Sequence, residues 1–257
     1  MFSLEQFLVP QIFTVLLIFA RIGTGIMFMP GFAEIYVNIR FRLILALCIA
    51  VLMAPLLHDF MPPVPASPLT LVILLFGESF IGLMIGLVAR FIISAMHIVG
   101  TIVSTQSSLS MSTQFDPTQA SQGTTIGNFM SVTAVVVLFS VDLHLVMLRG
   151  LSDSYTLFIP GDFPPVEDFS NYLALLLSKV FDISFQLSAP IIVISLLLYF
   201  AAGILSRLMP SLQVFYLILP VQVGLSLFVL MVVFSALMMN YTQYFADTFG
   251  GFLEEFG

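Results

Sequence analysis

The fold is decided by one apolar stretch, residues 69–103, which reads LTLVILLFGESFIGLMIGLVARFIISAMHIVGTIV. Two of its thirty-five residues, Glu78 and Arg90, are charged at pH 7. A bilayer core of about 30 Å needs roughly 20 helical residues. The stretch is therefore predicted to be a membrane helix that is too long for one straight span. It must tilt, break or extend beyond the lipid.

The composition of the whole chain has the same character. Of its 257 residues, 60% are apolar and 8% are charged, and the mean hydropathy is +1.13. Soluble domains average roughly 45–50% apolar and about 25% charged residues. The net charge of −7, with few and scattered basic residues, offers no patch for phosphate contacts. We therefore predict an integral membrane protein and exclude a nucleic-acid-binding one.

Five further apolar stretches flank the central one, and each is predicted to form a helix. They are residues 8–29, 43–57, 125–148, 172–205 and 212–241. The stretch 43–57 is marginal for spanning alone, whereas 172–205 is again too long. Pro190 and Pro220 are expected to kink the last two helices. No strand-like alternation is present, so the predicted fold is all-α and multi-pass, with about six long helices. Residues 151–171 are predicted to be an acidic loop.

The N-terminal end is expected to remain as a membrane anchor. Residues 1–10 carry Glu5 and no Lys or Arg, and the apolar run that follows is too long for a cleavable signal peptide. The positive-inside rule places Arg40, Arg42 and Arg207 in the cytoplasm, although Arg149 opposes this orientation.

The sequence carries no signature of a catalytic or metal centre. Metalloprotease, nucleophile-elbow and phosphate-loop motifs are missing from it. Cys48 is the single cysteine, and the three histidines are isolated from one another. We expect no cofactor, no metal and no catalysis. An intramembrane enzyme with a composite site assembled across helices stays open as an alternative.

Among the charged residues inside the predicted helices, five are candidates for buried or contact roles: Arg21, Glu78, Arg90, Lys179 and Asp182. A lipid-facing charge costs at least about 2.5–3.5 kcal/mol, so these residues should face protein or water. Lys179 and Asp182 are close enough in sequence to pair along one helix. We favour buried polar or subunit-contact roles over a proton path, since so few unclustered charges make a poor relay. An ion-coupled small-molecule transporter with broken helices remains the alternative function.

Gly82 and Gly86 form a small-xxx-small pattern within the central stretch. Small residues at this spacing let a second helix approach closely. We therefore interpret the two glycines as a site of helix packing.

A polar segment rich in Ser, Thr and Gln, residues 104–123, follows the central stretch. Its central residues are Gln106, Ser107, Ser108, Leu109, Ser110, Met111, Ser112, Thr113 and Phe115. From Thr105 to Pro117 it contains no Lys, Arg or Glu. Such a segment can lie at membrane depth only where protein or water surrounds it, and methionine adapts its shape to what it contacts. The alternatives are a plain linker and a flexible seal in a water-filled passage.

Several short motifs follow one another along the chain. They are ARIG at 20–23, PGF at 30–32, RFR at 40–42, AP at 54–55, GESFIGL at 77–83, LSM at 109–111, FDP at 115–117, LSRLMP at 205–210, QVF at 213–215 and LP at 219–220. Their order and spacing resemble the FliR/SpaR/YscT family of type III secretion export-gate membrane proteins, with the flagellar branch favoured over the virulence branch. Ser108, where glycine is usual, and Ile218, where a small residue is common, depart from the pattern.

The resemblance implies a non-enzymatic subunit of a protein-export channel. Residues 1–150 would form a FliP-like part that includes a channel plug at 106–117, and residues 151–257 a FliQ-like helical hairpin and tail. The chain would join FliP-like and FliQ-like subunits in a hetero-oligomeric helical ring. That ring would lie in the bacterial inner membrane within the flagellar basal body, with FlhA-like and FlhB-like proteins as further partners. Unfolded substrates would pass through the channel, which the plug would otherwise close.

Overall fold

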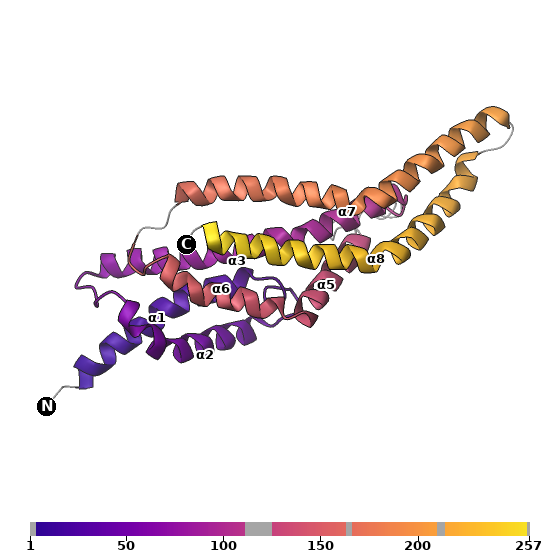
Figure 1. Cartoon of the computed structure of the whole chain (residues 1–257). Coiled ribbons are helices and arrows are strands. Elements are labelled where there is room, and N and C mark those ends of the chain that lie inside the picture. The colour runs from indigo at the N-terminus through magenta and orange to yellow at the C-terminus, as the bar shows by residue number, and fades with distance from the viewer. Residues whose placement is uncertain (1–3, 111–124, 163–165, 210–213, 256–257) are drawn as a thin grey trace. The chain divides into compact units, whose positions relative to one another are not determined.

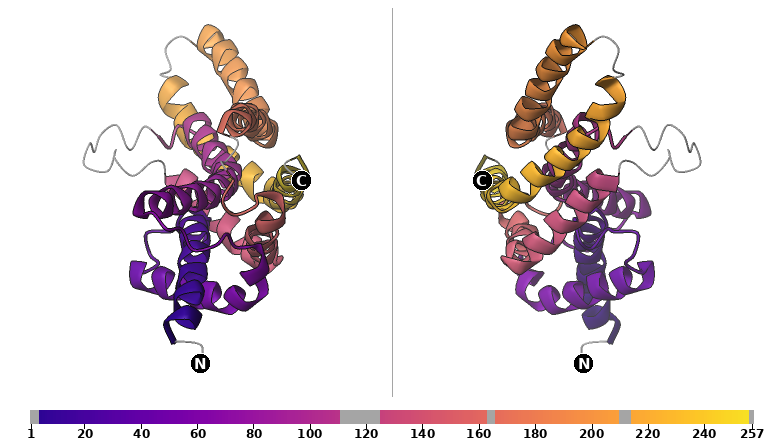
Figure 2. Two further views of the ribbon diagram at one scale, coloured as in Figure 1. Left: turned by 90° about the vertical axis from the view of Figure 1, so that its left-hand side faces the viewer. Right: turned by 90° about the vertical axis from the view of Figure 1, so that its right-hand side faces the viewer.

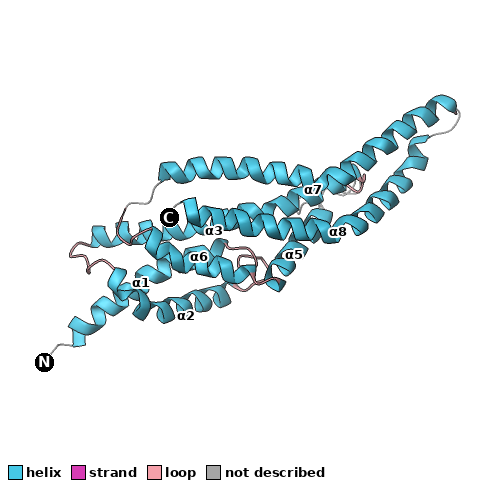
Figure 3. Ribbon diagram, in the orientation of Figure 1, coloured by secondary structure: helices cyan, strands magenta, loops and turns pink. Residues whose placement is uncertain are grey.

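The computed structural model describes residues 4–110, 125–162, 166–209 and 214–255. Every regular element in these ranges is a helix (Figures 1 and 3). The elements are α1 (Leu4–Phe28), α2 (Ile39–Leu57), the short 3-10 helix η1 (His58–Phe60), α3 (Pro68–Gln106), α5 (Thr125–Ser140), α6 (Leu143–Leu157), α7 (Val166–Leu208) and α8 (Val214–Glu255). The predicted all-α fold is confirmed.

Five of the described helices are long and apolar enough to cross a membrane, or six spans are present if α5 and α6 count as one bent span. This confirms a multi-pass protein. Helix α3 is continuous over 39 residues, which at 1.5 Å per residue is about 58 Å. Its length is therefore not explained by a break. Helices α7 and α8 are longer still, with 43 and 42 residues, and contain Pro190 and Pro220. Figure 1 shows both of them bending.

Two boundaries predicted from hydropathy were wrong. Residues 151–171 do not form one loop, because α6 continues to Leu157 and α7 begins at Val166. Residues 125–148 do not form one helix, because α5 ends at Ser140. Asp142, which precedes α6, has φ 60°. A right-handed helix cannot continue through this left-handed conformation.

Two other helices extend further than predicted. Helix α2 begins four residues earlier than the apolar stretch, because Asn38 Oδ1 accepts a hydrogen bond from the Arg40 amide at 2.9 Å and caps the helix. With 19 residues it is long enough to span. Helix α8 runs to Glu255, well beyond the apolar stretch that ended at Tyr241.

The chain forms two compact units. The first comprises Met1–Ile92, Phe139–Leu176 and Ala246–Gly257, and the second comprises Ile93–Leu138 and Leu177–Phe245. Helices α1, α2 and α6 belong to the first unit. Helices α3, α5, α7 and α8 contribute residues to both.

In the first unit, α1 and α3 approach so closely that a side chain cannot fit between them. A Cβ added at Gly82 would lie 2.0 Å from the Arg21 carbonyl oxygen and 2.2 Å from Thr24 Oγ1. A Cβ added at Gly86 would lie 2.7 Å from Phe28 Cβ. Glu78, Gly82 and Gly86 are spaced four residues apart, so they lie on the same face of α3. This face packs against α1.

In the second unit, α7 and α8 lie side by side as a helical hairpin (Figures 1 and 2). The C-terminal part of α3 crosses α5 at two glycines, since a Cβ added at Gly100 would lie 2.5 Å from Gly127 Cα. Ser184 of α7 donates a hydrogen bond to the carbonyl of Ala95 on α3 at 3.2 Å. Glycine contacts and buried serines thus bring helices together here.

The glycine contact between α1 and α3 makes a testable prediction about stability. Gly82→Ala should destabilise the protein by about 1–3 kcal/mol or more, because its Cβ meets rigid backbone atoms. Gly77→Ala on the same helix is the matched control, since nothing lies within 4 Å of its added Cβ, and helix propensity alone favours alanine by about 1 kcal/mol. Thermal unfolding of the detergent-solubilised protein would compare them. Equal unfolding temperatures would contradict the close contact.

Candidate functional site

Arg21 is the central residue of a buried polar cluster in the first unit. Its side chain is 0% exposed, and that of Glu78 is 2% exposed. Arg21 Nε donates to Glu78 Oε2 at 2.6 Å, and Nη2 donates to Oε1 at 3.1 Å. Nη1 donates to the Ser154 carbonyl at 2.9 Å and to Ser154 Oγ at 3.2 Å, while Nη2 also reaches the Phe158 carbonyl at 3.0 Å. All five N–H groups of the guanidinium are therefore used.

The position of Arg21 explains how a charge is accommodated among apolar helices. Ser154 lies in the last turn of α6, and Phe158 is its C-cap. Carbonyls at a helix C-terminus lack partners within the helix and carry a partial negative charge, so a cation there is stabilised. The Tyr155 ring lies 4.1 Å from Arg21 Cζ and adds a cation–π contact. One side chain thereby ties α1 to α3 and α6.

The other three charged residues predicted to be buried or at contacts are not part of this cluster. Arg90 is 44% exposed and forms an ion pair with Glu34 Oε1 at 2.8 Å. Lys179 and Asp182 are exposed on α7, and no ion pair joins them, so the expected local pairing is not formed. Arg21 and Glu78 alone among the five meet each other directly.

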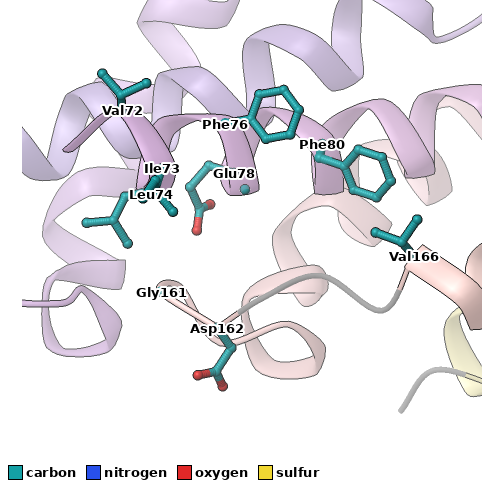
Figure 4. Close-up of a pocket in the computed structure, with 10 residues that line it drawn as sticks. Val72, Ile73, Leu74, Phe76, Glu78, Phe80, Gly161, Asp162 and Val166 are labelled. Atoms are coloured by element: carbon teal, nitrogen blue, oxygen red, sulfur yellow. The ribbon is translucent and has the colours of Figure 1, made fainter. Parts of the chain in front are cut away.

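A pocket of about 560 Å³ lies beside Glu78, between the start of α3 and the loop that precedes α7 (Figure 4). It is lined by Val72, Ile73, Leu74, Phe76, Gly77, Glu78, Phe80, Gly161, Asp162 and Val166. Both Glu78 oxygens already accept hydrogen bonds from Arg21, and the rest of the lining is largely apolar. The pocket therefore suits an apolar occupant better than a polar solute with a coupling ion. In the described part of the chain, no three His, Cys, Asp or Glu side chains gather to hold a metal ion.

The predicted plug segment begins at the end of α3. Gln106, Ser107, Ser108, Leu109 and Ser110 are described, whereas Met111, Ser112, Thr113 and Phe115 lie outside the described residues. Ser107 is buried, and its amide donates to the Val103 carbonyl at 2.9 Å. Ser108 has φ 59°, a conformation that glycine adopts without strain. A glycine at this position, which the family resemblance leads one to expect, would fit this backbone without strain.

The carbonyl of Gln106 is held by two side chains from other helices of the second unit. Ser195 Oγ of α7 donates to it at 3.3 Å, and Gln222 Nε2 of α8 donates to it as well. Gln222 Nε2 also donates to Tyr199 Oη at 2.9 Å. Sequence reasoning missed both Ser195 and Gln222. The one signal that could have found Gln222 is an uncharged but strongly polar residue within a very apolar stretch.

The chain matches the family model described as bacterial export proteins, family 1, over residues 12–248. It is 32% identical over 237 residues to the flagellar biosynthetic protein FliR of Caulobacter vibrioides, covering 92% of this chain and 94% of that one. FliR of Bacillus subtilis is 30% identical, with 91% and 90% covered. The Yop proteins translocation protein T of Yersinia pestis is 29% identical, with 71% and 70% covered.

The buried ion pair makes a prediction about stability. Arg21→Met should destabilise the protein by about 3–5 kcal/mol, because it leaves the Glu78 carboxylate buried without its partner. Replacing both residues, as Arg21→Met with Glu78→Met, should cost clearly less than the sum of the two single changes. Thermal unfolding of the four proteins in detergent gives the coupling free energy. Strict additivity would show that the pair does not act as a unit.

Proposed function

Since the chain belongs to family 1 of the bacterial export proteins, we propose that it forms, with FliP-like and FliQ-like subunits, the channel through which unfolded flagellar substrates are exported. Its family membership and its apolar helices make it a component of a type III secretion export apparatus and a multi-pass protein of the inner membrane. The proposed role is structural and requires no catalysis. FlhA-like and FlhB-like export proteins are proposed as further partners.

The exposed apolar length of α7 is the observation that supports a hetero-oligomer most directly. Large apolar side chains are exposed from Leu177 to Leu208, with Phe200 72% and Leu208 73% exposed. This interval measures about 46 Å along the helix. Lys179, Asp182 and Arg207 are exposed within the same interval, and a charge that faces lipid is costly. We infer that other subunits cover part of this surface.

The proposed division of labour follows the chain. Residues 1–150 take the FliP-like role, and residues 151–257 take the FliQ-like role. The side-by-side arrangement of α7 and α8 supports a FliQ-like helical hairpin. Arg21 and Glu78 are proposed to be structural, because every donor of one and both oxygens of the other are engaged within the chain.

Residues 106–117 are proposed to plug the channel until substrate arrives. The segment follows α3 directly, and from Thr105 to Pro117 its side chains include no Lys, Arg or Glu. Residues 106–113 have neutral polar and flexible apolar side chains, which can close on one another without burying an unpaired charge.

Two rival functions are less well supported. An ion-coupled transporter needs a compact polar substrate site, whereas the pocket at Glu78 is mostly apolar and its buried carboxylate is bonded. A composite-site enzyme gains no support from the histidines, since His144 of the first unit is stacked on Phe139 and His97 of the second lies near Ser131.

Native mass spectrometry tests the proposed assembly. The chain should be co-expressed with the FliP-like and FliQ-like proteins encoded in the same genome. We expect one copy of this chain in a large hetero-oligomer and poor stability when it is expressed alone. A stable monomer or homodimer that ignores those proteins would contradict the proposal.

Deletion of Ser107–Thr113 tests the plug. In the assembled complex the deletion should raise ion leakage across the membrane, because the seal is removed. Replacing the same seven residues with an equally long Gly/Ser segment controls for loop length while removing Leu109 and Met111. Unchanged conductance of the deletion variant, at equal abundance of the complex, would refute the plug assignment.

A further inference from the structure

At the C-terminal end of α3, the carbonyls of Val103, Ser104 and Thr105 accept from local backbone amides, whereas the last carbonyl, that of Gln106, is bonded by side chains of the hairpin. The last four carbonyls of an α-helix have no partner within that helix. The carbonyl of Gln106, the last residue of α3, accepts hydrogen bonds from Ser195 of α7 and from Gln222 of α8. Two helices thus converge on one backbone atom.

Burial and two hydrogen bonds fix the position of the Gln222 side chain. It is 1% exposed, in the very apolar helix α8, and a buried amide is costly unless it is hydrogen-bonded. The two N–H groups of its Nε2 match two acceptors, the Gln106 carbonyl and Tyr199 Oη. Ser195, which is 0% exposed, approaches the same carbonyl from α7.

Packing alone does not hold this helix end. A pocket of about 300 Å³ adjoins it, with Ser108, Tyr199, Gly203, Ser206, Ile218 and Gln222 among its lining residues. Empty space beside Ser108 means that apolar contacts there are incomplete. The hydrogen bonds to the Gln106 carbonyl are therefore the restraint on this helix end that α7 and α8 supply.

The chain just after Gln106 adopts a strained backbone conformation. Ser108 adopts the strained left-handed region, and its amide donates to the Thr105 carbonyl at 3.2 Å. The Ser110 amide donates back to the Ser104 carbonyl at 3.2 Å. A non-glycine residue keeps such a conformation only where its surroundings impose it.

We propose that Gln222 and Ser195 are positioning residues that anchor the end of α3 and so set where the polar segment begins. This inference rests on the proposed function for its consequence, which is a tighter channel seal. The anchoring itself is a local property of the second unit. It can be measured whether or not the segment acts as a plug.

Hydrogen–deuterium exchange of the assembled complex tests the anchor. Gln222→Met keeps the length of the side chain and removes its donors. The amides of Ser107, Ser108 and Ser110 should then exchange about fivefold faster, the order expected for the loss of one hydrogen bond. The matched control is Gln186→Met, since Gln186 is exposed on α7. Equal exchange in Gln222→Met and the control would overturn the proposal.

A pair of serine variants repeats the test from α7. Ser195→Ala removes the second donor to Gln106 and should also speed exchange at the end of α3. Ser188→Ala is its control, because Ser188 is equally buried but donates within its own helix, to the Ser184 carbonyl at 2.8 Å. Similar exchange in both serine variants would contradict a role for Ser195.

Ion leakage separates the anchor from the plug. With the complex at equal abundance, Gln222→Met should raise leakage, though less than deletion of Ser107–Thr113 does. If the deletion leaks and Gln222→Met does not, the positioning role in sealing is wrong. If the deletion does not leak, the plug assignment fails, and the exchange measurement alone decides whether Gln222 anchors the helix.

Discussion

Arg21 is the constraint on which the first unit depends. Its guanidinium uses every donor it has, on a carboxylate of α3 and on the last carbonyls of α6. The contact is possible only because Gly82 lets α3 lie against the Arg21 backbone. Close approach and ion pairing therefore require each other, and neither would persist if α1 and α3 moved apart.

The second unit contains a similar hydrogen bond to a helix end, made by a neutral side chain. Gln222 reaches from one helix to the unpaired carbonyl at the end of another, as Arg21 does at the end of α6. The last carbonyls of a helix have no partner within that helix, and among apolar helices a long polar side chain can provide one. In both units the polar residue that looks out of place in an apolar stretch completes the end of a neighbouring helix.

The helices, but not these contacts, could be predicted from the sequence. Apolar length identified α1, α3, α7 and α8, because lipid or protein must cover so many consecutive apolar residues. Hydropathy missed the break before α6, since one left-handed residue, Asp142, barely alters an average. Arg21 and Glu78 were recognised singly but not as partners, being 57 residues apart. The acceptors at Ser154, Phe158 and Gln106 are backbone carbonyl oxygens. Every residue type has such an oxygen, so the sequence does not reveal which ones accept.

The neutrality of the chain around the end of α3 has an electrical consequence. A charged group that moves across a membrane potential gains or loses about 2.3 kcal/mol per 100 mV. Residues 104–113 carry no ionisable side chain, so the voltage of an energised membrane exerts no net force on their side chains. Within the proposed plug, residues 106–117, the field would act on a single ionisable side chain, that of Asp116, so a passage closed by this segment would open to a mechanical push from an entering chain more readily than to the electric field.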